Sequence, residues 1–160
     1  MDEPARSAGG KQAVPRVVLD TNVCLDLFVF HDPRVVALGA ALQSSQVHAV
    51  TDAACREEWL RVLRYPQLAL DEAARASAVA AFDALVECMP AGEPEAALPP
   101  LPRCGDPDDQ KFLELARNAG AGWLVSRDDE LLRLGRRTRL DGLFEIIEPQ
   151  AWPPATERNA

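Results

Sequence analysis

Acidic residues gather at four places in this sequence, each at the start or within the first two turns of an expected helix. They are Asp20, Glu58, the group Asp106, Asp108 and Asp109, and Asp128. A cluster of carboxylate oxygens without histidine or cysteine suits Mg²⁺ or Mn²⁺, which keep several of their water ligands. Ions held in this way can activate water against a phosphodiester and stabilise the leaving oxygen. Phosphodiester hydrolysis is therefore the chemistry that the pattern favours, if the fold brings the four places together.

The first place is the end of the run Val17–Leu19, where Asp20 is followed by Thr21 and Asn22. In open α/β folds, ligands bind beyond the carboxyl ends of the strands, so this Asp20 carboxylate points into the expected crevice. An alternative is that Asp20 only caps the following helix, which is a common role for aspartate. Thr21 and Asn22 could cap the same helix and orient Asp20, the support that metal-binding carboxylates need.

The second place is the pair Glu57 and Glu58, about two turns into an expected helix. Glu58 shares a helical side with apolar Val62, whereas Glu57 is spaced to pair with Arg61 at i+4. We therefore expect Glu58 to face the strand ends and Glu57 to face solvent. On this helix alone, two solvent-facing glutamates would be the simpler interpretation.

The third place carries three acids within four positions, Asp106, Asp108 and Asp109, at the start of a helix. A helix N-terminus favours acids by about 0.3–1 kcal/mol each, so one or two of them could be capping residues. Three exceed what capping requires, and a bound cation would relieve their mutual repulsion. Asp109 leads the apolar face that begins at Phe112, which turns it toward the sheet. The sequence leaves open which of the three is the main ligand.

The fourth place follows the run Trp123–Val125, where Ser126 and Arg127 precede Asp128. Asp128 is the first helix cap or ligand available there, whereas Asp129 and Glu130 are expected to face water. Each of the four places has an ordinary explanation. Their coincidence at four strand–helix junctions is what indicates a shared metal site.

The elements expected around these acids alternate between short apolar strands and amphipathic helices. Strands are expected at Arg16–Asp20, Val47–Thr51, Trp123–Ser126 and Phe144–Ile147. Helices are expected at Asn22–Phe30, Pro33–Ser44, Asp52–Arg64, Asp71–Met89, Asp108–Ala119 with Gly120 as its stop, and Asp128–Leu134 with Gly135 as its stop, before a turn at Pro149–Trp152. Strands that are apolar throughout are typical of a parallel sheet covered on both faces. The order predicts a three-layer α/β fold with right-handed crossovers.

The length of 160 residues fits one domain with a substantial core. We expect a disordered segment at residues 1–14, a single domain at 15–152 and a flexible tail at 153–160. The segment Pro90–Arg103 contains five prolines and is expected to be a loop within that domain. No signal peptide and no apolar run of roughly 20 residues are evident, so we expect a cytoplasmic protein without a membrane segment.

Charge and composition restrict the classes of function. The net charge of −8 is unusual for a protein that binds nucleic acid. The basic residues are nevertheless grouped, at Arg56, Arg61 and Arg64 and again at Arg127, Arg133, Arg136, Arg137 and Arg139. The chain has only two histidines, which makes a Ser-His-Asp triad a poor interpretation. Its four cysteines are widely spaced and form no C-x-x-C pair, which argues against a zinc ribbon.

Four motifs in this order resemble the PIN domain. They are Val18-Leu19-Asp20-Thr21-Asn22-Val23, then Glu58 with Val62-Leu63 and Pro66, then Asp106-Pro107-Asp108-Asp109 with Phe112-Leu113 and Leu115-Ala116, then Leu124-Val125-Ser126-Arg127-Asp128 with Leu131-Leu132. One such motif is a weak signal, but four in the right order with compatible spacing are a strong one. The resemblance covers residues 17–152 and is closest to the bacterial VapC-like branch, described as toxin components of toxin–antitoxin systems.

The resemblance implies a three-layer α/β/α PIN-like fold, with a parallel sheet of strand order 3-2-1-4-5, and Mg²⁺- or Mn²⁺-dependent endoribonuclease activity. It implies that Asp20, Glu58, Asp109 and Asp128 bind the metal, with Asp106 as a further candidate. It also suggests a homodimer and an antitoxin protein as partner.

The mechanism expected from this set is in-line hydrolysis of RNA. Asp20, Glu58 and Asp109 hold the metal, while Asp128 completes the site or positions the attacking water. The carboxylates are expected to be oriented by the supporting residues Thr21, Asn22 and Ser126. The RNA backbone is expected to be contacted by Arg127, Arg133, Arg136 and Arg137.

Two other classes of function compete with a nuclease. A phosphatase of the type that places its nucleophile after the first strand needs a second aspartate two residues later, where this chain has Asn22. A PIN-like scaffold that only binds protein would fit the negative charge. Such a scaffold has no need to keep four acids together against their repulsion.

Overall fold

A parallel five-stranded sheet forms the centre of the protein in a computed structural model that describes residues 13–90 and 97–154. The strands are β1 (Arg16–Leu19), β2 (His48–Thr51), β3 (Val86–Cys88), β4 (Trp123–Val125) and β5 (Glu145–Ile147). Their order is β3-β2-β1-β4-β5, and every neighbouring pair is parallel. The predicted fold class and strand order are confirmed. Most of the predicted disordered segment (1–14), most of the predicted tail (153–160) and part of the predicted proline-rich loop lie outside the described residues, at 1–12, 155–160 and 91–96.

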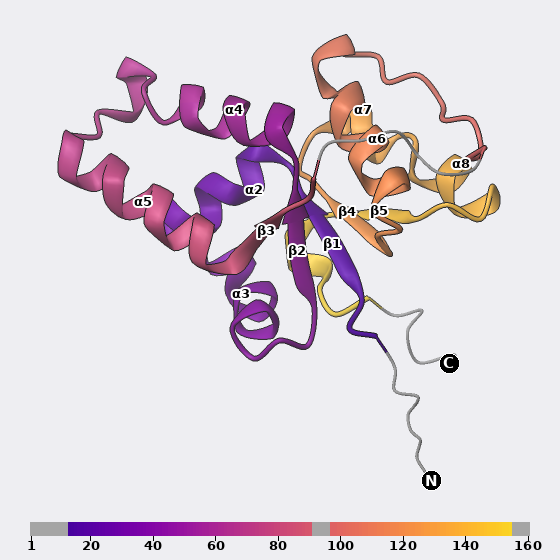
Figure 1. The fold of residues 1–160 in the computed structure, drawn as a ribbon, viewed down its shortest axis with the longest axis horizontal. Helices are drawn as coiled ribbons and strands as arrows, with labels where there is room; N and C mark the ends of the chain where they lie inside the picture. The colour runs from indigo at the N-terminus through magenta and orange to yellow at the C-terminus, as the bar shows by residue number, and fades with distance from the viewer. Residues whose placement is uncertain (1–12, 91–96, 155–160) are drawn as a thin grey trace, which may run out of the picture.

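Helices cover both faces of this sheet (Figure 1). The longer ones are α2 (Thr21–Leu25), which continues as the π-helical turn η1 (Asp26–Phe30), α3 (Val36–Gln43), α4 (Ala53–Val62), α5 (Glu72–Leu85), α6 (Gln110–Asn118), α7 (Asp129–Leu132) and α8 (Gly135–Leu140). Short 3₁₀ turns are η2 (Pro33–Val35), η3 (Pro66–Leu68), η4 (Pro107–Asp109) and η5 (Pro149–Ala151). In Figure 1, α2 to α5 lie on one side of the sheet and α6 to α8 on the other.

The central strand β1 divides its side chains between two hydrophobic cores. Val17 and Leu19 belong to the core shared with α2 to α5, whereas Val18 belongs to the core shared with α6 and α7. This follows from the alternation of side chains along a strand. Because both faces of β1 are buried from Val17 to Leu19, these three residues are apolar, and the next polar side chain, Asp20, comes just past the end of the strand.

The strand β3 departs from the sequence prediction, which continued one helix from Asp71 to Met89. The helix α5 ends at Leu85, and Val86 is extended, with φ −117° and ψ 120°. Val86 pairs with Ala49 of β2, and the Met89 amide donates to the Thr51 carbonyl at 2.8 Å. No glycine, proline or other turn residue separates this short edge strand from the alanine-rich helix before it, so the sequence pattern predicts one continuous helix.

Gly135 was also predicted wrongly, as the stop of a helix. It is the first residue of α8, after α7 has ended at Leu132. A side chain at this position would place its Cβ 3.2 Å from the Ile146 carbonyl oxygen of β5. Glycine is therefore used here for close approach to the sheet. Gly120, by contrast, has φ +66° just past α6 and does end its helix as predicted.

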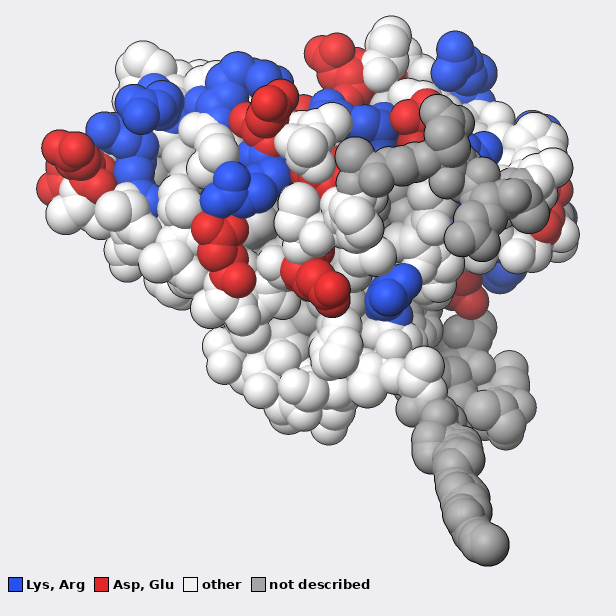
Figure 2. Space-filling model, in the orientation of Figure 1, with Lys and Arg blue, Asp and Glu red and all other residues white. Residues whose placement is uncertain are grey.

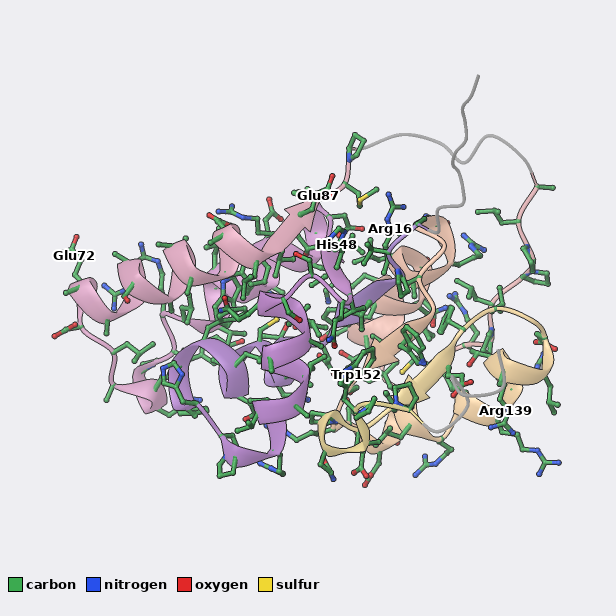
Figure 3. All side chains as sticks on the ribbon, turned by 90° about the horizontal axis from the view of Figure 1, so that it is seen from below. Arg16, His48, Glu72, Glu87, Arg139 and Trp152 are labelled. Atoms are coloured by element: carbon green, nitrogen blue, oxygen red, sulfur yellow. The ribbon has the colours of Figure 1, made fainter. Side chains whose placement is uncertain are left out.

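The amino ends of the strands lie at the edge of the sheet opposite to Asp20 and Ser126, which follow the carboxyl ends of β1 and β4. Arg16 and His48 lie beside each other there, at paired positions of β1 and β2 (Figure 3). Arg16 Nη1 donates to the Ala119 carbonyl at 2.9 Å, and Trp152 packs edge-on against Trp123 with 5.0 Å between ring centroids. Among the described helices, none is long and apolar enough to cross a membrane.

Candidate metal centre at the carboxyl edge of the sheet

Asp20, Ser126 and Asp128 are joined by hydrogen bonds where β1 and β4 end. The pairing of Leu19 with Val125 places Asp20 next to Ser126, which is completely buried. Ser126 Oγ donates to Asp20 Oδ2 at 2.6 Å and accepts from the Asp128 amide at 2.9 Å. Asn22 Nδ2 makes a longer contact of 3.4 Å with the same Asp20 oxygen. Ser126 therefore fixes the positions of two predicted metal-binding acids relative to each other.

Asp106 and Asp109 lie at the two ends of the turn η4. Asp106 begins the turn and accepts from the Asp108 amide at 3.0 Å, while Asp109 is 9% exposed and Asp108 faces solvent. Oxygens of Asp106, Asp109 and Asp128 lie within 4.8 Å of one another. The structure thus brings Asp106 and Asp109 together and leaves Asp108 outside. Proline at the first position of the turn sets this geometry, because its φ is already helical.

The loop before this turn is held in place by Gln110, which was not among the predicted site residues. Gln110 Oε1 accepts from the Cys104 amide at 2.8 Å, and its Nε2 donates to the Pro102 carbonyl at 3.1 Å. Glutamine in the first turn of a helix is a common capping residue, and that was the available signal. These two hydrogen bonds fix the backbone of residues 102–104, which directly precedes Asp106 and Asp109.

The pKa values of two acids in this cluster are raised. Burial raises the pKa of Asp20 to about 6, against the hydrogen bond from Ser126, and the charges of Glu58 and Asp128 add to the rise. Burial raises the pKa of Asp109 to about 8, together with the hydrogen bond to Asp128 and the charges of Asp20, Asp128 and Asp106. Burial, followed by the charges of the neighbouring carboxylates, thus favours the protonated forms of Asp20 and Asp109 in the metal-free protein.

These donors fit a hard divalent cation. Asp106, Asp109 and Asp128 offer oxygen only, are close enough to share one ion, and carry a repulsion that a cation would relieve. Asp128 Oδ1 also accepts from the Glu130 amide at 2.8 Å, so it caps α7 as well. Capping of α7 therefore does not remove Asp128 from the acidic group, and its role as a metal ligand stays a prediction.

Glu58 lies at the same edge, and both oxygens of its carboxylate already have partners within the protein. It is half-buried while Glu57 is exposed, which is the orientation that the sequence predicted. Thr21 Oγ1 donates to Glu58 Oε2 at 2.6 Å, and Lys111 Nζ lies 2.6 Å from Glu58 Oε1. Burial lowers the pKa of Lys111, but the hydrogen bond and charge of Glu58 outweigh it and raise the pKa overall. Lys111 is one of two lysines in the chain and follows the three aspartates, yet it was not predicted as a site residue.

Arg127, predicted to guide RNA, is held by a buried acid. Its Nε lies 2.8 Å from Asp26 Oδ2, and Asp26 is 2% exposed. The Arg127 amide also donates to Asn22 Oδ1 at 3.4 Å. These bonds tie the segment between Ser126 and Asp128 to α2 and η1. The contact of Arg127 with RNA stays a prediction, and its structural partner is Asp26.

We expect replacement of Arg127 by methionine to lower the free energy of unfolding by on the order of 2 kcal/mol. The change leaves the Asp26 carboxylate buried without a partner, which is more costly than losing a surface pair. Urea denaturation measures the difference. The matched control is Arg137→Met, which breaks an exposed ion pair with Asp141 and should cost about 0.5 kcal/mol or less. Equal losses in the two variants would contradict the interpretation of the Asp26 pair.

The other predicted RNA-guiding arginines lie on the surface of α7 and α8. Arg133 pairs with Glu130 at 3.1 Å and Arg137 with Asp141 at 3.3 Å, while Arg136 is exposed. Figure 2 shows a further group of basic side chains over α4 and the adjoining part of α5. The helix α4 and the residues after it carry Arg56, Arg61 and Arg64. Basic side chains thus flank the acidic edge on both sides.

Comparison with known sequences agrees with this geometry. Residues 16–130 match the sequence profile of a PIN-domain family, over more than half of the chain. A comparison with curated proteins finds no significant match. The matched segment begins with β1, includes Asp20, Glu58, Asp106, Asp109 and Asp128, and ends within α7. The chain therefore belongs to the PIN-domain family, whose fold is of the nuclease type.

Proposed function

We propose that this protein is an Mg²⁺- or Mn²⁺-dependent endoribonuclease and the toxin component of a toxin–antitoxin pair. The observation that carries the nuclease proposal is the group Asp106, Asp109 and Asp128, with oxygens within 4.8 Å of one another. Asp20 is bonded through Ser126 to the same loop as Asp128. All of them stand where ligands bind in parallel α/β sheets.

The residues that would hold the ion are Asp109 and Asp128, with Asp106 at the open side and Asp20 at the strand end. A divalent cation, when bound, supplies charge for the phosphodiester oxygens and acidifies water. The all-oxygen donor set is compatible with either Mg²⁺ or Mn²⁺.

The protein groups position the reactants. The chain Asp128 amide–Ser126 Oγ–Asp20 Oδ2 keeps the two carboxylates in a fixed relation. We assign Asp128 the role of orienting the attacking water for in-line displacement, as a hydrogen-bond acceptor at the edge of the cluster. No histidine is needed as a base in this scheme, which agrees with the two histidines lying elsewhere, at His31 and His48.

RNA as the substrate is supported by the family membership and by the basic side chains beside the acids. The α4 arginines and the α7–α8 arginines can contact phosphates on either side of a bond held at the cluster. The toxin role, an antitoxin protein as partner and a homodimer are proposed from the resemblance to the VapC-like branch.

The test is cleavage of a mixed-sequence single-stranded RNA by the purified protein with Mg²⁺, Mn²⁺ or EDTA. We expect internal cuts that require the metal and are lost in the Asp20→Asn variant. The matched control is Asp129→Asn, which alters an exposed acid at the neighbouring junction and should leave cleavage unchanged. A single-stranded DNA of the same sequence reports the preference for the sugar. A folded protein that neither cuts RNA nor binds Mn²⁺ would overturn the proposal in favour of a PIN-like protein-binding module.

A further inference from the structure

Lys111 places a positive charge inside the acidic edge. Within residues 13–90 and 97–154, it is the only basic residue ion-paired with one of the five predicted metal-binding acids. It comes from the first turn of α6 and reaches Glu58 of α4, with 2.6 Å between Nζ and Oε1. Both side chains are largely buried, so water screens the pair only in part.

The Glu58 carboxylate has a partner on each oxygen. Lys111 takes Oε1, and the Thr21 hydroxyl donates to Oε2 at 2.6 Å. Glu58 also stands outside the group of acids whose oxygens lie within 4.8 Å of one another, which consists of Asp106, Asp109 and Asp128 among the described residues. A metal ion at Glu58 would have to displace an ammonium and break a short hydrogen bond.

Lys111 is held from its own side as well. Its ammonium donates to the Asp108 carbonyl in the turn η4, which carries Asp109, and lies 5.2 Å from the centre of the Phe112 ring. The ammonium therefore bridges Glu58 and the turn that presents the cluster. It occupies a fixed place between them, in contrast to the exposed arginines of α8.

We propose that the Lys111 ammonium occupies the cation position at Glu58, so that the acidic edge binds one divalent ion, at Asp106, Asp109 and Asp128 beside Asp20. The inference rests on the metal dependence proposed above and fixes the number of ions. In a two-ion site the ions lie roughly 3.5–4 Å apart, and an ammonium held at Glu58 takes the place of the second ion and repels it. Glu58 is then a positioning residue, which holds Lys111, rather than a metal ligand.

The inference is tested by titrating the EDTA-stripped, dialysed full chain with Mn²⁺, using calorimetry and the electron paramagnetic resonance signal of free Mn²⁺. We expect one Mn²⁺ per wild-type chain. The Lys111→Met variant frees Glu58 and should bind a second Mn²⁺, with the first bound about tenfold more tightly because a nearby positive charge is gone. Lys111→Arg keeps the charge and should bind one ion. The double variant Lys111→Met with Glu58→Gln removes the freed carboxylate and should return to one ion.

The outcomes separate the two proposals. Two ions in the wild type, or one ion in a folded Lys111→Met variant, would overturn the role of Lys111 and leave the nuclease proposal standing. No Mn²⁺ binding by the wild type would overturn both. The wild-type stoichiometry is decisive even if a variant fails to fold, and thermal melting shows which variants are folded.

Discussion

Replacing Asp109 by asparagine is expected to stabilise the metal-free protein and to abolish cleavage. The Asp109 carboxylate is buried beside Asp20, Asp106 and Asp128, and its raised pKa of about 8 reflects that position. The amide removes the repulsion, so the melting temperature in EDTA should rise by a few degrees. The same change removes a negatively charged ligand from the cluster, so metal-dependent cutting should fall by about a thousandfold or more.

The two readouts must move in opposite directions. Differential scanning calorimetry in EDTA gives the stability, and RNA cleavage with saturating Mn²⁺ gives the activity. Asp108→Asn is the matched control, because Asp108 is the exposed neighbour in the same turn. Both quantities should stay near the wild-type values in that control. A destabilised Asp109→Asn variant would mean that Asp109 serves the fold, and the loss of cutting would then say little about metal binding.

The stability of the metal-free protein is expected to fall as the pH rises from 5 to 8. The folded-state pKa values of Asp20, about 6, and Asp109, about 8, both exceed the ordinary value of 3.8. Between the ordinary and the folded pKa, the folded chain binds more protons than the unfolded chain, so stability decreases with increasing pH. For the nearly fully buried Asp20, a rise of about two units corresponds to on the order of 3 kcal/mol.

Melting temperatures measured between pH 5 and pH 8 in EDTA test this expectation. The Asp20→Asn variant should decline less steeply below about pH 6.5 and as steeply as the wild type above it, because asparagine does not titrate while Asp109 still does. Saturating Mg²⁺ should raise the melting temperature more at pH 8 than at pH 6, since protons compete with the ion for the carboxylates. A metal-free melting temperature that rises steadily over this range would contradict the pKa pattern.

The carboxyl-edge acids could be predicted because each follows a local signal. Asp20 ends an apolar strand, Asp109 leads an apolar helix face, and Glu58 shares a helical side with Val62. Such patterns are local, and the parallel sheet then forces the strand ends to one edge. The fold class followed from the same alternation of strands and helices, with the strand order supplied by the family resemblance.

The remaining features depend on contacts that no local pattern specifies. Lys111 of α6 forms an ion pair with Glu58 of α4. Arg127 forms one with Asp26, which is 101 positions away in the sequence. Both partners are charged residues on helices, where a solvent-facing side chain is the ordinary expectation. The choice between Asp106 and Asp108 likewise depended on the geometry of one 3₁₀ turn, in which the exposed Asp106 carboxylate lies near Asp109 and Asp128 and the Asp108 carboxylate does not.

The hydrogen bond between Ser126 and Asp20 spans 106 positions of the sequence. During synthesis, the first acid of the cluster leaves the ribosome long before the strand that orients it, and β1 lacks one of its neighbours until β4 is made. The growing chain therefore carries an incomplete set of the predicted metal-binding acids until Asp128 has been made. A nuclease of the kind proposed above could therefore not act before both halves of its sheet have been made.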